Sequence, residues 1–350
     1  MDISDRAAQT PRPSVAAAAP VLSSIVPNTG PAAGSSTVTL NGSSFTGAIS
    51  VTFGANAALT YSVDTSAKIT AVTPPGTGAV AVTVRTPGGT SNSVTYTYAA
   101  TPSLISISPS QGPAAGGTTV VLTGTGLNGA TAVTFGSNPA TGFTVNSATQ
   151  ITAVAPAGTG AVPVTVTTTG GTTGPVYYFY LSAPSLISVS PNQGPATGGN
   201  TVVLTGTGLT GATAVTFGTH AATSYTVNSA TQITAVAPAG TGAVPVTVTT
   251  TGGTSNTVVY TYVAAPVLTG LAPAQGPTDA GAGVTLTGTG LTTTGTVSFG
   301  AVPAAFTVLS DTTVVAQAPA GPVGPVAVTV TTSGGTSNSR TYTRVSPPEI

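Results

Sequence analysis

The segment Asn146–Thr172 reads NSATQITAVAPAGTGAVPVTVTTTGGT, and it recurs without change at Asn228–Thr254. In the second copy Val244–Thr249 alternates strictly, with Val on one face and Thr or Pro on the other. This period of two is typical of a β-strand with one buried face. Pro245 inside the run predicts that its strand lies at a sheet edge or carries a bulge. A long unaltered duplication predicts a chain built from repeated β-modules.

The repetition extends beyond this segment, because the whole chain repeats every 82 residues. Three sets of positions keep this step: Pro20, Pro102, Pro184, Pro266; Phe53, Phe135, Phe217, Phe299; and Leu40, Leu122, Leu204, Leu286. The fourth copy loses one residue before Pro319 and regains one before Val330, so its register recovers. The period is too long for a solenoid unit of about 20–45 residues. It suits a small domain with a core of its own.

Each copy contains about seven short β-like runs separated by turn residues. In the third copy the expected strands are 186–189, 201–205, 214–217, 224–227, 232–236, 244–249 and 258–262, with a turn at Pro191–Pro195. This number and spacing of strands is typical of an immunoglobulin-like sandwich. The sequence therefore predicts an all-β protein of four tandem immunoglobulin-like β-sandwiches arranged in a rod.

A set of short motifs strengthens this prediction. In the second copy they are Gly112–Gly117 (GPAAGG), Val120–Gly124 (VVLTG), Val133–Gly136 (VTFG), Ile151–Pro156 (ITAVAP), and Gly170-Gly171 before Tyr177–Tyr180. Together they resemble the IPT/TIG domain, and the resemblance runs from Pro20 to about Arg344. The first copy departs from the turn motif at Ser35, and the fourth at Thr278–Gly281. The resemblance implies the fold. It implies no single function, because the family occurs in surface receptors, bacterial surface proteins, phage virions, carbohydrate-active enzymes and transcription factors.

The repeat predicts four modules with short joints. The expected modules are 20–98, 102–180, 184–262 and 266–344, and we call them repeats one to four. The joints Ala99–Thr101, Leu181–Ala183 and Val263–Ala265 contain no Gly, so neighbouring modules are expected to touch or nearly touch. Residues 1–19 are either an extended tail or an arm that docks on another copy by adding a strand to a sheet edge.

Charge is scarce. Only 3% of the residues are Asp, Glu, Lys or Arg, the formal net charge is zero, and none of these residues occurs between positions 102 and 265. A chain without a basic patch is a poor partner for nucleic acid. A net charge near zero favours association between copies. No apolar stretch reaches the length of a membrane span, so insertion into a membrane is not expected.

The sequence offers no catalytic, cofactor-binding or metal-binding residues. His220 is the only histidine, its counterparts Asn56 and Asn138 are not ligands of the same kind, and an exposed loop position is expected. Repeats two and three contain no carboxylate that could orient it, so a Ser-His-Asp arrangement cannot form there. The acids Asp64, Asp279 and Asp311 lie in distant or separate parts of the sequence, so the closely spaced carboxylate pair of a glycosidase is not expected. We therefore expect a protein that is not an enzyme and holds no cofactor.

Aromatic residues leave two interpretations open. Phe135 and Tyr178 are expected in the core. Tyr225, Tyr260 and Tyr262 could form a strip on which sugar rings stack, but aromatic residues recur regularly in every repeat. Regular recurrence favours a packing role for them.

These observations favour a structural role, as a rod-like subunit of an extracellular or cell-surface fibre that self-associates through its module ends or its N-terminal arm. The charges gather in the two terminal modules, at Asp64, Lys68, Arg85, Asp311, Arg340, Arg344 and Glu349, and would meet in a head-to-tail polymer. The alternative is an adhesin, a carbohydrate-binding chain or a phage virion decoration or tail protein. Expected partners are further copies of the chain, or a cell-surface polysaccharide or protein. No signal peptide is visible, so a virion origin is a second possibility beside the extracellular one.

Overall fold

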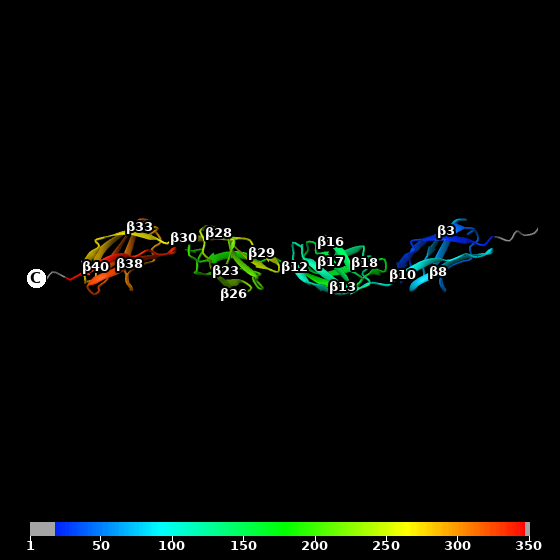
Figure 1. Ribbon diagram of the computed structural model, residues 1–350, viewed down its shortest axis with the longest axis horizontal. Helices are drawn as coiled ribbons and strands as arrows, with labels where there is room; N and C mark the ends of the chain where they lie inside the picture. The colour runs from blue at the N-terminus through cyan, green and yellow to red at the C-terminus, as the bar shows by residue number, and fades with distance from the viewer. Residues whose placement is uncertain (1–17, 347–350) are drawn as a thin grey trace, which may run out of the picture. The chain divides into compact units, whose positions relative to one another are not determined.

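The computed structural model describes residues 18–346, and within this range all regular structure is β-strand (Figure 1). Four sandwiches follow one another along the chain, which confirms the predicted fold class. Apart from Gly112–Ala114, repeats one and two make up one compact unit, and repeats three and four make up another. The predicted strand-adding arm at residues 1–19 falls almost wholly outside the described residues, as does Glu349.

The strands of repeats one and two have the following bounds. Repeat one comprises β1 (Val21–Val26), β2 (Thr29–Pro31), β3 (Thr37–Ser43), β4 (Ser50–Phe53), β5 (Asn56–Ala57), β6 (Thr60–Thr65), β7 (Lys68–Val72), β8 (Gly78–Thr86), β9 (Gly89–Thr90) and β10 (Val94–Ala99). Repeat two comprises β11 (Ser103–Ser108), β12 (Gln111–Pro113), β13 (Thr119–Thr125), β14 (Ala132–Phe135), β15 (Asn138–Pro139), β16 (Gly142–Ser147), β17 (Gln150–Val154), β18 (Gly160–Thr168), β19 (Gly171–Thr172) and β20 (Val176–Leu181).

Repeats three and four follow the same order. Repeat three comprises β21 (Ser185–Ser190), β22 (Gln193–Pro195), β23 (Thr201–Thr207), β24 (Ala214–Phe217), β25 (His220–Ala221), β26 (Ser224–Ser229), β27 (Gln232–Val236), β28 (Gly242–Thr250), β29 (Gly253–Thr254) and β30 (Val258–Val263). Repeat four comprises β31 (Val267–Ala272), β32 (Gln275–Pro277), β33 (Ala282–Thr289), β34 (Thr296–Phe299), β35 (Val302–Ala304), β36 (Phe306–Ser310), β37 (Thr313–Ala318), β38 (Gly324–Thr332), β39 (Gly335–Thr336) and β40 (Arg340–Val345).

All four modules share one topology of two packed sheets. In repeat three, one sheet has the order β21-β23-β27-β26, and the other has the order β22-β30-β28-β24-β25 with β29 paired to β28. All the pairings are antiparallel except that of β22 with β30, which is parallel. The first strand of the sequence therefore lies in one sheet, and the next short strand crosses to the other.

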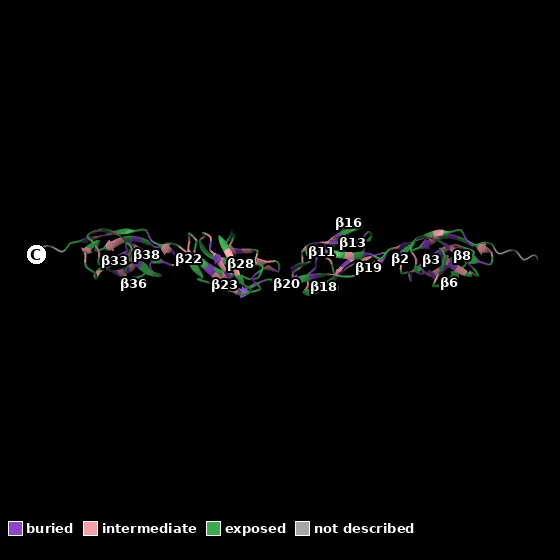
Figure 2. Cartoon of the chain, turned by 90° about the horizontal axis from the view of Figure 1, so that it is seen from below, coloured by how far each residue is buried: buried purple, intermediate pink, exposed green. Residues whose placement is uncertain are grey.

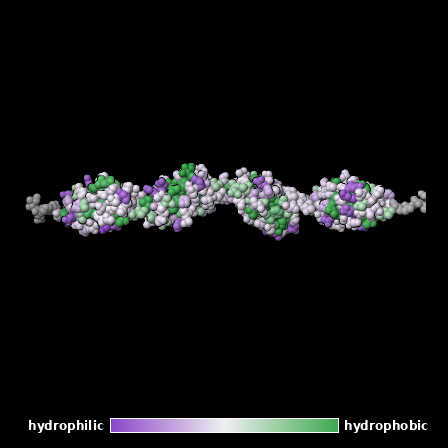
Figure 3. Space-filling model, turned by 90° about the horizontal axis from the view of Figure 1, so that it is seen from above, coloured by the Kyte–Doolittle hydropathy of each residue, from purple (hydrophilic) through white to green (hydrophobic). Residues whose placement is uncertain are grey.

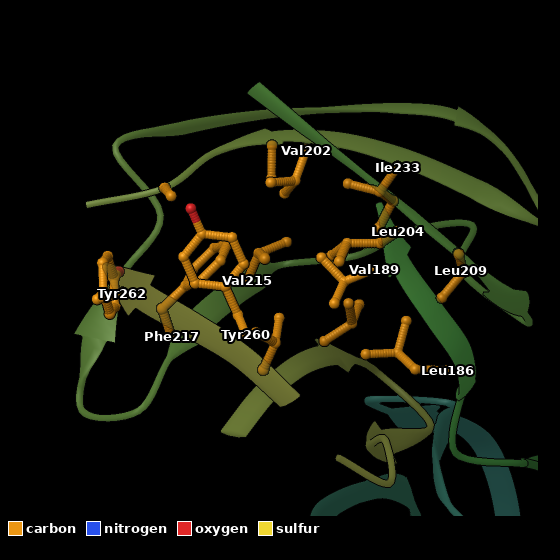
Figure 4. Close-up of a cluster of buried hydrophobic side chains, with 14 residues drawn as sticks. Leu186, Val189, Val202, Leu204, Leu209, Val215, Phe217, Ile233, Tyr260 and Tyr262 are labelled. Carbon is orange, nitrogen blue, oxygen red and sulfur yellow. The ribbon is translucent and has the colours of Figure 1, made fainter. Parts of the chain in front are cut away.

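The core of each module lies between its two sheets, where buried and exposed residues alternate along the strands (Figure 2). In repeat three the cluster runs from Leu186 at one end to Tyr262 at the other (Figure 4). The ring of Tyr260 lies at its centre, with its centroid 5.3 Å from that of Phe217 and 5.0 Å from that of Tyr262. Both contacts are edge-to-face, the arrangement that aromatic quadrupoles favour.

Two predictions for the strands of repeat three were wrong. The expected turn at Pro191–Pro195 ends in the short strand β22 rather than in loop. Pro245 lies on β28, which is an inner strand between β30 and β24 and not an edge, and the pairings of β28 with both strands run without a bulge. Its nitrogen faces β24, because a residue's N–H and C=O point to the same neighbour and Gly218 donates its N–H to the Pro245 carbonyl. Because β24 ends at Phe217, no residue of β24 lies opposite Pro245. The N–H that proline lacks therefore costs the sheet no hydrogen bond.

The joints before repeats two, three and four each pass close to the Gly-Gly turn of the module that follows. A Cβ on Gly170, Gly252 or Gly334 would overlap the backbone carbonyl of the preceding joint, at Ala100, Ser182 or Ala264. Only glycine therefore lets the joint pass so close to the turn. The second glycine of the turn in repeat three, Gly253, has a φ of +119°, which other residues rarely adopt.

An asparagine fixes the first strand in three of the four modules. In repeat three Asn256 accepts the Leu186 N–H at 2.8 Å and donates to the Leu186 carbonyl at 2.9 Å. Asn92 and Asn338 make the same pair of bonds in repeats one and four. Repeat two has Gly174 at this position. Its Leu104 is only half-buried, whereas the corresponding leucines of the other three modules are buried.

Candidate functional site

The most distinctive surface lies on repeat two, where two aromatic side chains point outward from β20. Tyr177 and Phe179 are 55% and 47% exposed. The strand β18 pairs Pro163 with Tyr177 and Ala161 with Phe179, so these four residues share one side of the sheet. We call Tyr177, Phe179, Pro163 and Ala161 the aromatic face.

The strand alternation explains why these rings are exposed. Tyr178 and Tyr180 of the same strand are buried in the core of repeat two, with ring centroids 5.0 Å apart. Because neighbouring side chains of a strand point to opposite sides, Tyr177 and Phe179 must face outward. Repeat three keeps the two buried tyrosines but has Val259 and Thr261 at the outward positions, and repeats one and four have Thr there. The aromatic face is therefore specific to repeat two.

The surroundings of the aromatic face carry no charge. In the space-filling view, hydrophilic and hydrophobic patches are scattered over surfaces of mostly intermediate hydropathy (Figure 3). Neighbouring outward positions on β18 carry Thr, and repeat two contains no Asp, Glu, Lys or Arg. An exposed pair of large aromatic rings without charged neighbours is typical of a surface that binds another molecule.

The tyrosines that sequence reasoning considered for a sugar-stacking strip have other roles. Tyr260 and Tyr262 are buried, and burial raises the pKa of both phenols. Tyr225 is partly buried and donates its hydroxyl to the Ala212 carbonyl at 3.2 Å. The packing interpretation was therefore correct. The aromatic face itself was missed, although the run Tyr177–Tyr180 with four consecutive aromatic residues could have shown it: if two of them are core, the other two must be exposed.

His220 is exposed, as the sequence predicted, but it lies on the short strand β25 and not in a loop. Within residues 18–346 no three side chains of the His, Asp or Glu types lie together in a way that could hold a metal ion. The structure brings no carboxylate to His220, since repeat three contains none.

Several charged side chains of the terminal modules contact groups of their own module. Lys68 lies 3.7 Å from Asp64, and Arg340 donates to the Leu268 carbonyl at 2.9 Å. Arg344 is buried at the position of Tyr262 in repeat three and donates to the Pro319 carbonyl at 2.9 Å. Side chains that are occupied in this way stabilise their own module, and they are weak candidates for contacts between the ends of two chains.

The fold and the motifs can be compared with known proteins. The family model described as the IPT/TIG domain matches residues 20–98, 102–180, 184–262 and 266–344. The chain belongs to the IPT/TIG family. The four matches cover nearly the whole sequence, so each repeat is one IPT/TIG domain, and the chain is a tandem array of immunoglobulin-like β-sandwiches.

Solved structures with similar architecture come from several kinds of protein. The plexin A4 extracellular region is 21% identical over 91% of this chain and 30% of its own, with a TM-score of 0.34. Invasin, a bacterial integrin-binding protein, is 18% identical over 93% of this chain and 79% of its own, with a TM-score of 0.29. SGBP-B of Bacteroides uniformis is 20% identical over 65% of this chain and 66% of its own, with a TM-score of 0.25. The chain spans 30% and 48% of the two plexin A4 structures.

Nowhere between residues 18 and 346 does the chain form a helix of the length and hydropathy that crossing a bilayer requires.

Proposed function

We propose that this chain is a non-enzymatic structural protein of an extracellular or cell-surface assembly, and that it associates with further copies of itself through the aromatic face. The observation that carries the proposal is the exposure of Tyr177 and Phe179 on a sheet whose sister modules carry Thr or Val there. Burying two such rings removes a large apolar area from water, which is the main driving force of association.

The charge distribution favours a second copy as the occupant of this face. No Asp, Glu, Lys or Arg occurs between positions 102 and 265, so two copies of repeats two and three meet without charge repulsion. The same scarcity leaves no complementary charge with which to attract a strongly acidic or basic partner. Contacts through the module ends or through residues 1–19 would add to this face in a fibre.

Sedimentation velocity across a concentration series tests the proposal. The full chain is expected to sediment faster as its concentration rises, and negative-stain microscopy of the concentrated sample should show filaments. Replacing both rings by the residue of repeats one and four, in the double variant Tyr177→Thr and Phe179→Thr, should weaken association by about tenfold or more. The matched control is Val259→Thr in repeat three, which changes the same outward position and should associate like the parent chain.

Two outcomes would contradict self-association through this face. One is a parent chain that stays monomeric at every concentration, and the other is a double variant that associates as strongly as the parent. The second result would move the contact to the module ends or to residues 1–19.

A second candidate function rests on the chemical type of the exposed side chains. Aromatic rings, unlike aliphatic side chains, offer a flat face on which the C–H groups of a sugar ring can stack. This property favours an adhesin, a carbohydrate-binding chain or a virion decoration protein. A pull-down on cell-wall material and insoluble polysaccharide separates the two functions, since retention that is lost in the double variant while the parent chain stays monomeric supports binding rather than assembly.

A further inference from the structure

A cleft opens on repeat three beside Tyr262. Figure 4 shows Tyr262 at one end of the core cluster. Its volume is about 760 Å³. It is lined by residues 196–197, by the β24–β25 hairpin at 217–220 and by residues 239–241, and Val244 and Tyr262 complete its wall. The volume lies within the range of sites for small molecules.

A hydrogen bond that spans the corresponding gap in repeats one and two is missing here. Asn56 donates its side-chain amide to the Pro75 carbonyl at 3.2 Å in repeat one, and Asn138 donates to the Ala157 carbonyl at 3.3 Å in repeat two. Repeat three has His220 at this position, and its imidazole makes no such bond to the loop that contains Ala239. The two loops of repeat three are therefore not tied across the cleft.

The buried tyrosine at this end has also lost its partner. Tyr98 donates its hydroxyl to the Pro74 carbonyl at 2.7 Å, and Tyr180 donates to the Pro156 carbonyl at 2.8 Å. Tyr262 occupies the same place in repeat three, yet its buried hydroxyl has no hydrogen-bond partner within the described residues. A buried hydroxyl without a partner is unfavourable, so this wall of the cleft gains stability if a small shift brings an acceptor within reach.

Most of the residues that line the cleft are the same in repeats two and three. Repeats two and three share the residues that form its apolar wall and its glycine-rich loop, including the counterparts of Phe217, Val244 and Tyr262. Three lining positions differ. Thr197, Thr219 and His220 stand in place of Ala115, Ser137 and Asn138. The apolar part of the wall and Thr241 are kept, while one hydroxyl is gained at position 197 and two polar side chains are exchanged.

We propose that this cleft is a binding site for a neutral saccharide of one or two rings. The threonine hydroxyls and the ring nitrogens of His220 can donate or accept hydrogen bonds, as sugar hydroxyls do. The side chains of Val244 and Tyr262 provide an apolar wall for the C–H face of a sugar ring. No Lys, Arg, Asp or Glu is present between positions 102 and 265, so nothing in the module would balance a charged ligand. This site lies on another module than the aromatic face and does not depend on self-association.

The single histidine makes the test direct, because the full chain gives one set of imidazole proton signals in an NMR spectrum. The probes are glucose, galactose, mannose, N-acetylglucosamine and their β-1,4-linked disaccharides. Weak ligands have dissociation constants in the millimolar range, so each probe is titrated to a concentration about ten times higher. At least one of them should shift the His220 signals in a saturable way at one site per chain. Glucuronate and inorganic phosphate, as charged probes, should not shift them.

Two variants sharpen the test, with the binding saccharide measured by calorimetry. His220→Asn installs the residue of repeat two and should weaken binding by about tenfold or more, because it also restores a donor that can close the cleft. The triple variant Ala115→Thr, Ser137→Thr and Asn138→His transfers the differing positions to repeat two and should raise the stoichiometry from one site to two. The double variant in the aromatic face should leave binding unchanged, which separates this proposal from self-association.

The proposal is overturned if none of the neutral saccharides shifts the His220 signals, if the charged probes shift them instead, or if His220→Asn binds as tightly as the parent chain.

Discussion

Repeats two and three share an unaltered 27-residue segment, Asn146–Thr172 and Asn228–Thr254, and the same ten-strand topology, yet their surfaces differ. Repeat two carries the aromatic face and lacks the asparagine that fixes the first strand. Repeat three keeps that asparagine and opens a cleft beside His220. The buried positions of the two modules are nearly the same. Because outward positions and loop tips contribute little to folding, they are free to change without loss of the core.

The largest expected effect is a loss of local stability in β21 when the asparagine of repeat three is replaced. Asn256→Gly installs the residue of repeat two and removes both hydrogen bonds to the backbone of Leu186. These bonds are partly buried, so we expect a loss of about 2 kcal/mol in the local stability of β21. Hydrogen exchange of the Leu186 amide should be faster by about tenfold or more, while the Leu22 amide of repeat one serves as the unchanged control. An unchanged Leu186 rate would show that strand pairing with β23 alone holds β21.

The reverse change in repeat two should have a smaller, stabilising effect. Gly174 has open space where a Cβ would lie and has no positive φ, so Gly174→Asn meets no steric obstacle. The new amide can bond to the backbone of Leu104, and loss of a glycine also reduces the freedom of the unfolded chain. We expect a gain of about 1 kcal/mol, seen as slower exchange of the Leu104 amide. Gly174→Ala is the control for the glycine effect alone, and equal protection in both variants would exclude the hydrogen bonds.

The central tyrosines of the two modules should respond differently to loss of the hydroxyl. Tyr260 donates to the Asn200 side chain at 2.8 Å, whereas the Tyr178 hydroxyl is buried without a partner among the described residues. Tyr260→Phe should therefore cost about 1 kcal/mol and Tyr178→Phe should cost nothing or stabilise. Denaturant unfolding of the two variants, followed by exchange of amides in β30 and β20, measures both. Equal effects in the two modules would contradict this account of the hydroxyl groups.

The smallest expected effect is that of pH on the local stability around Asp311. It distinguishes repeat four, which contains this carboxyl, from the inner modules, which contain none. The Thr292 hydroxyl and the Gly290 N–H bond to Asp311 and lower the pKa of its carboxyl below the ordinary value of 3.8. A lowered pKa gives stability that is present above about pH 3.9 and is lost as the pH falls through the folded-state value. Exchange of the Leu291 amide, corrected for intrinsic rate, should therefore become faster in acid.

The matched position in repeat three provides the control for this pH effect. The Leu209 amide donates to the Ala230 carbonyl at 2.9 Å, as the Leu291 amide donates to the Asp311 carbonyl, and repeat three contains no carboxylate. Its corrected exchange rate should not depend on pH. Equal acid sensitivity of Leu291 and Leu209 would show that the carboxyl of Asp311 does not stabilise its loop.

The architecture could be predicted from the sequence because it depends on three features that are visible there. These are the alternation of apolar and polar residues, the glycines of the turns and the 82-residue repeat. Sequence reasoning also predicted that Tyr260 and Tyr262 pack inside, and that His220 is exposed. It wrongly placed Pro245 at a sheet edge or a bulge. An inner proline is acceptable because β24 ends at Phe217, and this end depends on pairing between segments that are distant in the sequence. The cleft also escaped prediction, since it arises from hydrogen bonds between loops that are far apart in the sequence.

The central claim is that the aromatic face makes the contact between copies, and moving the face tests it most directly. One chain carries Tyr177→Val and Phe179→Thr in repeat two together with Val259→Tyr and Thr261→Phe in repeat three, so that the outward residues of β20 and β30 are exchanged. Its sedimentation across a concentration series is compared with that of a chain carrying only the first two changes. We predict that association is lost with the two changes and is at least partly restored with all four, since the ring pair is then present on an equivalent sheet. Association that is the same in both chains and in the parent would contradict the claim.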